Sequence, residues 1–147
     1  MSGYLDQYGA GEERREKTIK YTAAAVVAVL IAGGVLYFLF KNYREERQAK
    51  QFFALLARHD YKGAYALWGC TESKPCRDFP FSEFMKDWGP EAKILSPDQF
   101  RITKSRSCGS GVILTVETGK EAPEKLWVQR DDLTLGYSPW PGCPPGR

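Results

Sequence analysis

Residues 21–40, YTAAAVVAVLIAGGVLYFLF, form an apolar run that contains no charged side chain. A helix rises about 1.5 Å per residue, so a run of this length spans about 30 Å, the thickness of a bilayer's hydrocarbon core. Basic residues flank the run on both sides, and tyrosines lie near both ends, where membrane proteins place residues at headgroup level. The run predicts a transmembrane helix, because a buried core helix is seldom apolar on all faces over such a length.

The end of this run argues against cleavage by signal peptidase. Residues 36–40, LYFLF, are bulky, whereas a cleavage site requires small residues. No cysteine follows closely enough to accept a lipid. We therefore expect an uncleaved signal anchor, with a tail over 1–20 and a helical stalk over 41–50.

A helical pattern continues after the run. Ala49, Phe52, Phe53 and Leu56 recur at i, i+3, i+4 and i+7 and predict one apolar helix face. Neither Gly nor Pro occurs between positions 41 and 62. We expect the membrane helix to continue outward as the stalk and to become the first helix of the domain.

Two shorter helices are predicted next. Asp60 is a suitable N-cap for a helix through Trp68, which Gly69 would end. A third helix is predicted over 82–88, because Gly89 and Pro90 follow directly.

Beyond position 90 the apolar residues alternate with polar ones, which predicts β-strands. Strands are expected near 100–104, 112–117, 126–129 and 133–137, with turns at 107–111, 118–124 and 130–132. Four prolines exclude a helix or a central strand from the C-terminal tail, 139–147. Helices followed by an antiparallel meander predict an α+β domain over 51–138.

Two segments resemble a known family. Residues 51–68, QFFALLARHDYKGAYALW, and residues 81–88, FSEFMKDW, are similar to helices of the nuclear-transport-factor-2-like (cystatin-like) superfamily. The resemblance covers about 50–138 and implies a cone-shaped fold whose sheet wraps the long helix. It also implies a membrane-anchored bacterial protein of the inner (plasma) membrane. The family includes enzymes, binding modules and assembly subunits, so the fold alone does not choose a function.

The charge balance argues against a nucleic-acid partner. The whole chain has a formal net charge of +3, and from Gln51 onward 13 basic residues stand against 12 acidic ones. A nucleic-acid-binding surface needs a clear basic stripe.

The distribution of positive charge does not decide which side of the membrane the N-terminus faces, because Lys and Arg number four in 1–20 and four in 41–50.

The cysteines predict both a crosslinked domain and an orientation. All four, Cys70, Cys76, Cys108 and Cys143, fall after the stalk. An even number in a small domain favours disulfides and an oxidising compartment, so we expect a cytoplasmic N-terminus and an extracytoplasmic domain. Cys70–Cys76 and Cys108–Cys143 are the expected pairs, although the other two pairings remain open. The spacing is not that of paired zinc ligands, and free thiols are expected only in a cytoplasmic domain.

Catalytic, metal-binding and cofactor-binding residues are not assigned. His59 is the single histidine, and it follows a predicted helix beside Asp60. An acid–base enzyme would need His59 to face a pocket beside a carboxylate. We expect a surface turn here, and a solvated turn at Asp131-Asp132.

Two other residue sets are candidates for recognition. Small residues at Ala24, Ala28, Ala32 and Gly33 form a stripe that lets another membrane helix approach closely. The domain is also rich in aromatic residues, which are expected either in the core, around a pocket for a small apolar ligand, or at an interface. They are Tyr65, Trp68, Trp88, Trp127, Tyr137 and Trp140.

These features favour a non-enzymatic, single-pass protein embedded in the membrane. Its outer domain would mediate interaction with other membrane proteins, as an accessory subunit of a larger complex. The alternative is a module of the same fold that binds a small ligand, and an acid–base enzyme is the third possibility. Trp140, in the tail, is the best candidate for a contact outside the domain.

Overall fold

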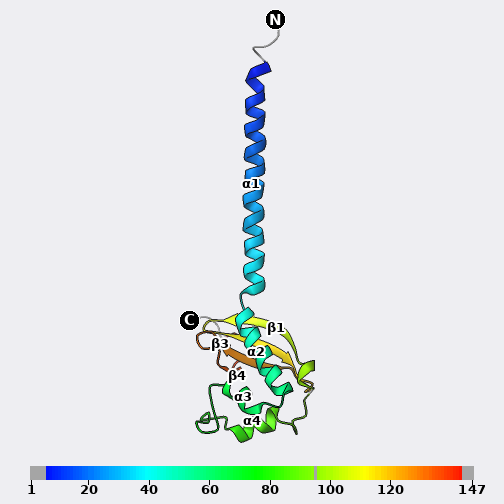
Figure 1. The fold of residues 1–147 in the computed structure, drawn as a ribbon, viewed down its shortest axis with the longest axis vertical. Helices are drawn as coiled ribbons and strands as arrows, with labels where there is room; N and C mark the ends of the chain where they lie inside the picture. The colour runs from blue at the N-terminus through cyan, green and yellow to red at the C-terminus, as the bar shows by residue number, and fades with distance from the viewer. Residues whose placement is uncertain (1–5, 95, 144–147) are drawn as a thin grey trace. The chain divides into compact units, whose positions relative to one another are not determined.

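The computed structural model describes residues 6–94 and 96–143. The chain forms two compact units, Met1–Lys41 and Asn42–Arg147. The first is a single helix, and the second contains the other helices and the sheet (Figure 1).

Helix α1 covers Asp6–Phe40. It begins earlier than the sequence indicates, because extending an existing helix needs only propagation and no new nucleus. From Arg14 onward its described side chains are exposed, including the large apolar ones between Val26 and Phe40. By its length and composition alone, the helix is long and apolar enough to cross a membrane. The first five residues of the predicted tail lie outside the described residues.

The helix is interrupted where the sequence predicted continuity. Lys41 and Asn42 form a turn, and helix α2 covers Tyr43–Ala57. Asn42 is buried, and its side chain hydrogen-bonds to the sheet instead of supporting a helix interior. The residues predicted as a stalk, 41–50, therefore lie mostly within α2, and Glu45 and Ala49 are buried in the second unit.

Helices α2, α3 and α4 confirm the predicted helical patterns. The predicted apolar face of α2, from Ala49 to Leu56, is buried. Helix α3 covers Tyr61–Ala66, and Asp60 is its N-cap, whose carboxylate accepts a hydrogen bond from the Gly63 N–H at 2.9 Å. Gly69 follows with a φ of +77°, a left-handed conformation that glycine adopts readily. Helix α4 covers Phe81–Trp88, and a short 3₁₀ helix, η1, covers Pro97–Gln99.

The four predicted strands form one antiparallel sheet in the order β1-β2-β3-β4. The strands are β1 (Arg101–Cys108), β2 (Gly111–Glu117), β3 (Glu124–Gln129) and β4 (Leu135–Tyr137). Strand β1 continues through the segment predicted as a turn, because Ser107 and Cys108 pair with β2 and leave Gly109 and Ser110 to turn the chain. Strand β4 begins later than predicted, since Leu133 adopts a left-handed φ of +59° in the preceding turn.

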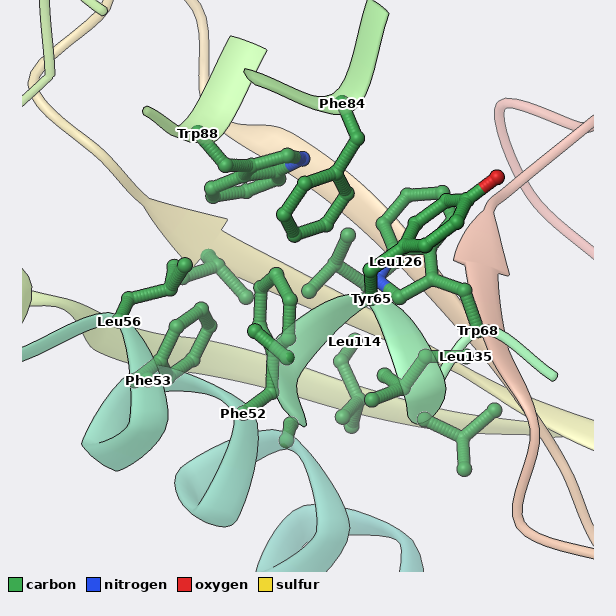
Figure 2. Packing of buried hydrophobic residues seen from close by; sticks show 14 of the residues in the cluster. Phe52, Phe53, Leu56, Tyr65, Trp68, Phe84, Trp88, Leu114, Leu126 and Leu135 are labelled. Carbon is green, nitrogen blue, oxygen red and sulfur yellow. The ribbon is translucent and has the colours of Figure 1, made fainter. Parts of the chain in front are cut away.

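One face of the sheet packs against the helices and forms the core. The inward residues of β2 and β3 alternate with outward ones and belong to the same buried cluster as the aromatic rings of α2 and α4. Figure 2 shows Phe52 among the rings of this core. Its centroid lies 5.1 Å from Trp88, 6.1 Å from Trp68 and 6.2 Å from Phe84. The domain is α+β, as predicted.

Replacing Phe52 with alanine is expected to destabilise the domain by about 3–5 kcal/mol, because it removes a fully buried ring and leaves a cavity between three others. Urea unfolding of the full chain in detergent, followed by tryptophan fluorescence, measures this loss. The matched control is Gln51→Ala, one position earlier and exposed, which should change the free energy of unfolding by less than about 0.5 kcal/mol. Equal effects of the two variants would contradict this account of the core.

Candidate functional site

The second face of the sheet, which we call the outer face, carries β1 side chains that a β-bulge turns outward. The register between β1 and β2 shifts between Ile102 and Lys104. Ile102 packs against the core, and strict alternation would direct Lys104 to the same side. The extra residue, Thr103, reverses the alternation, so that Lys104, Arg106 and Cys108 share the outer face.

Cross-strand pairing builds two rows of side chains on the outer face. Lys104 pairs with Thr115, which pairs with Lys125, in the first row. Arg106 pairs with Ile113, which pairs with Trp127, in the second row. The register therefore brings together three basic residues from two strands separated by β2.

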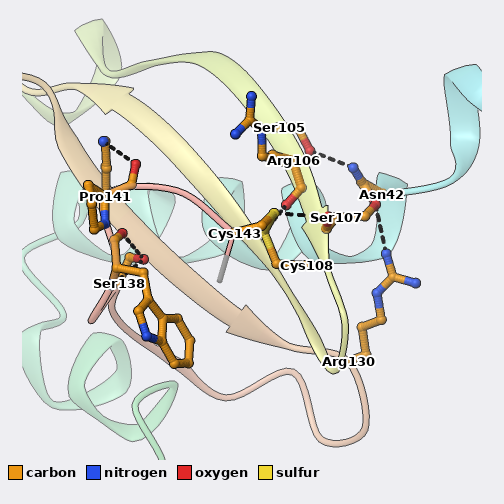
Figure 3. The surroundings of a disulfide bond; sticks show 11 residues. Asn42, Ser105, Arg106, Ser107, Cys108, Arg130, Ser138, Pro141 and Cys143 are labelled. Atoms are coloured by element: carbon orange, nitrogen blue, oxygen red, sulfur yellow. Dashed lines mark hydrogen bonds between the residues drawn. A yellow bond between two sulfur atoms is a disulfide. The ribbon is translucent and has the colours of Figure 1, made fainter. Parts of the chain in front are cut away.

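The C-terminal tail crosses the outer face (Figure 3). The Ser138 N–H donates a hydrogen bond to the Lys125 carbonyl at 2.8 Å, and Lys125 Nζ donates to the Pro141 carbonyl at 2.5 Å. A disulfide joins Cys143 to Cys108 at the end of β1. The tail is thus attached at β3 and at β1.

A hollow of about 170 Å³ lies between the tail and the strands. Ile113 is only 4% exposed, although it is absent from the core cluster on the other side of the sheet. The residues that line the hollow are Lys104, Arg106, Ile113, Thr115, Lys125, Pro141 and Gly142.

An aromatic pair lies beside the hollow. The ring of Trp127 lies across Gly111, where a Cβ atom would come within 2.2 Å of the indole. Glycine is therefore required at this position for the ring to lie there. Trp140 from the tail packs edge-to-face on Trp127 at 5.5 Å, and 41% of Trp140 remains exposed.

A polar cluster attaches the start of α2 to the sheet. Asn42 donates to Ser105 Oγ at 2.9 Å and accepts from Ser107 Oγ at 2.7 Å and from an Arg130 amino group at 3.1 Å. Arg130 Nε also lies 3.7 Å from the buried carboxylate of Glu45. Figure 3 shows Asn42 between Ser105, Ser107 and Arg130. These contacts use the inward-facing serines of β1 and do not involve the outer face.

The two disulfides pair as predicted. Cys70–Cys76 closes the loop after α3, and Cys108–Cys143 holds the tail. Free cysteines are absent from the described residues, which include all four cysteines of the chain.

The six aromatic candidates divide into two groups. Tyr65, Trp68 and Trp88 are buried in the core, and Tyr137 is half-buried against Trp68 and Trp88. Trp127 and Trp140 lie on the outer face. The first group therefore fills the space between helices and sheet, and the second is available for a contact outside the domain.

The surroundings of His59 do not form an acid–base site. Its side chain is exposed, its φ is +58° in the turn after α2, and its ring nitrogen contacts the Tyr61 hydroxyl at 3.0 Å. An acid–base enzyme built on His59 would need this side chain to face a pocket beside a carboxylate, and the solvent-facing side chain does not meet that requirement. Within the described residues, no group of three or more His, Cys, Asp or Glu side chains is placed to hold a metal ion.

Asp131 and Asp132 form the turn between β3 and β4. The Asp132 carboxylate accepts a hydrogen bond from the Thr134 N–H at 2.9 Å, and this bond lowers the pKa of the carboxyl. Both residues are exposed, in agreement with the predicted solvated turn.

The small-residue stripe lies on α1, where Ala24, Ala28, Ala32 and Gly33 are exposed. A Cβ atom added at Gly33 meets nothing within 4 Å. The stripe is thus open to a neighbouring helix.

No local pattern in the sequence marks Lys104, Arg106 and Lys125 as a group. Lys104 and Arg106 alternate along one strand, but Lys125 belongs to another, and only the register places it in the same row. The extra residue of the bulge has no distinctive signal in the sequence.

Comparison of the chain with protein-family models, with curated proteins and with solved structures finds no match. The resemblance to the nuclear-transport-factor-2-like superfamily therefore stays a prediction from residues 51–68 and 81–88.

The tail disulfide is expected to stabilise the domain more than the loop disulfide. Cys108–Cys143 spans a sequence separation of 35 and Cys70–Cys76 a separation of 6. Loop-closure entropy predicts losses of about 4 and about 2 kcal/mol, respectively, when each pair is replaced by serine. Each pair has one buried cysteine. Burying a serine hydroxyl in its place therefore costs a similar free energy in both variants. Urea unfolding measures the difference, and a reversed order would refute it.

Ionisation of Tyr137 is expected to destabilise the domain at high pH. Burial, together with its 2.9 Å hydrogen bond to the Asp87 carboxylate, raises the pKa of the Tyr137 hydroxyl above its ordinary value of about 10. The unfolded chain loses this proton near pH 10 while the folded chain keeps it, so the stabilisation is complete below pH 10 and falls as the pH rises further.

Unfolding experiments at about pH 8 and about pH 11 test this expectation. Tyr137→Phe should reduce the loss of stability between these conditions by about 1 kcal/mol, after allowance for the partial exposure of the ring. An identical pH dependence in wild type and variant would show that Tyr137 ionises as freely in the folded state as in the unfolded state.

Proposed function

We propose that this chain is a non-enzymatic, single-pass membrane protein whose disulfide-bonded domain binds other membrane proteins as an accessory subunit of a larger complex. Helix α1 would anchor it in a bacterial plasma membrane, with the N-terminus in the cytoplasm. The exposed apolar surface of α1 supports the anchor, because a contiguous apolar surface of this size is costly in water.

The two disulfides support the proposed orientation. Disulfides persist in oxidising compartments and are rare in the cytoplasm. Both disulfides lie in the second unit, so an extracytoplasmic domain fits the crosslinks.

The filled core is the observation that favours protein binding over an enclosed ligand site. Tyr65, Trp68 and Trp88, which would have to line an internal pocket, pack instead against Phe52 and Phe84. Recognition would then take place on surfaces, and the exposed Trp140 and the stripe on α1 are two features that suit it.

Purification of the full chain from native membranes in mild detergent, with mass spectrometry of the bound proteins, tests this function. We expect a stoichiometric set of membrane proteins that survives a wash in moderate salt. A chain that purifies alone, even after crosslinking in the membrane, would overturn the subunit proposal.

Bulkier residues on the stripe are expected to release partners that contact α1. Ala28→Leu with Ala32→Leu adds volume where a neighbouring helix would approach, and should reduce co-purification by at least about tenfold. Val26→Leu with Val29→Leu adds volume on other faces of the same helix and is the matched control. Unchanged association in the stripe variant would count against helix pairing.

A further inference from the structure

We propose that the outer face of the sheet binds an acidic, extended segment of a partner protein, with Lys104 and Arg106 contacting its carboxylates. This inference rests on the proposed function, because it names the surface and the chemistry through which the domain would bind its partner.

The charge of the hollow identifies the class of partner. Lys104, Arg106 and Lys125 line it, and its lining contains no acidic residue. Among the ion pairs of the described residues, none includes Lys104 or Arg106. Strand β2 adds one acidic residue to this face, Glu117, which lies opposite Arg101 in the strand register and does not line the hollow. Like charges on one sheet face repel each other, and a bound anion would relieve that repulsion.

The spacing of the basic residues suits an extended peptide. Lys104 and Arg106 are two residues apart on one strand, which separates their Cα atoms by about 6.6 Å. An extended segment repeats its same-side residues at the same spacing. Acidic residues at positions i and i+2 of the segment would therefore face Lys104 and Arg106 together.

The tail gives the hollow a fixed wall. Pro141 and Gly142 line it, and the tail is held before them by the Ser138 hydrogen bond to Lys125 and after them by the disulfide. A site whose walls are ordered before binding loses less conformational entropy on association. Trp140 stands exposed beside Trp127, and Trp and Arg are enriched among residues that dominate protein interfaces.

Binding of a defined peptide to the full chain tests the site. The probe is a fluorescent peptide with glutamate at alternate positions, and its control is the same peptide with glutamine at those positions. The chain is held in nanodiscs of neutral phosphatidylcholine. We expect the glutamate peptide to bind at least about tenfold more tightly than the glutamine peptide, with an affinity that falls as salt is added.

Matched charge reversals locate the binding. Lys104→Glu with Arg106→Glu should weaken binding of the glutamate peptide at least about tenfold. Lys74→Glu with Arg77→Glu makes the same change of charge at two exposed positions, one inside the loop closed by Cys70–Cys76 and one directly after it, and should leave affinity within about twofold. If the first pair impairs folding, as urea unfolding would show, Lys104→Gln with Arg106→Gln replaces it as the test of whether these side chains bind the peptide.

Three results would overturn the site: no preference for the glutamate peptide, equal weakening by both charge reversals, or competition by lipid. For the last, nanodiscs that contain anionic phosphatidylglycerol are compared with neutral ones. Loss of peptide binding in the anionic discs would make the outer face a surface for lipid headgroups.

The purification from native membranes distinguishes a failure of this site from a failure of the proposed function. Partners retained by the Lys104→Glu/Arg106→Glu chain would overturn the site and leave the subunit function intact. Specific peptide binding by a chain that purifies without partners would support the site and overturn the subunit function.

Discussion

The packing of Phe52 against the rings of Trp68, Phe84 and Trp88 is the interaction on which the domain depends. It joins α2 to α4 and to the segment after α3, three parts of the chain that have no backbone pairing with one another. These rings cover the inward residues of β2 and β3. Because the helices occupy this face of the sheet, the opposite face is left for the tail and for charged side chains.

The two faces of β1 have separate roles because of a single extra residue. Ile102 packs against the core, while Ser105 and Ser107 face inward and bind Asn42 at the start of α2. The bulge turns Lys104 outward beside Arg106. The same strand therefore secures the first helix of the domain and presents basic residues on the outer face.

The tail has structural importance despite its lack of regular secondary structure. Proline prevents it from adding a strand, so it is held by a disulfide, by two hydrogen bonds to Lys125 and by the contact of Trp140 with Trp127. These attachments place Pro141 and Gly142 as one wall of the hollow that Ile113 also lines. A covalent constraint thus replaces the packing that a longer sheet would provide.

The sequence by itself determined the apolar helix, the α+β class, the Asp60 cap and the apolar face of α2, because each depends on spacing between neighbouring residues. The cysteine pairs were also predicted, although the sequence left other pairings open. Tertiary structure alone decided the interruption at Asn42, whose partners Ser105, Ser107 and Arg130 lie more than sixty residues away. It also decided the basic group on the outer face, because strand register and a bulge, rather than local spacing, bring Lys104 and Arg106 together with Lys125.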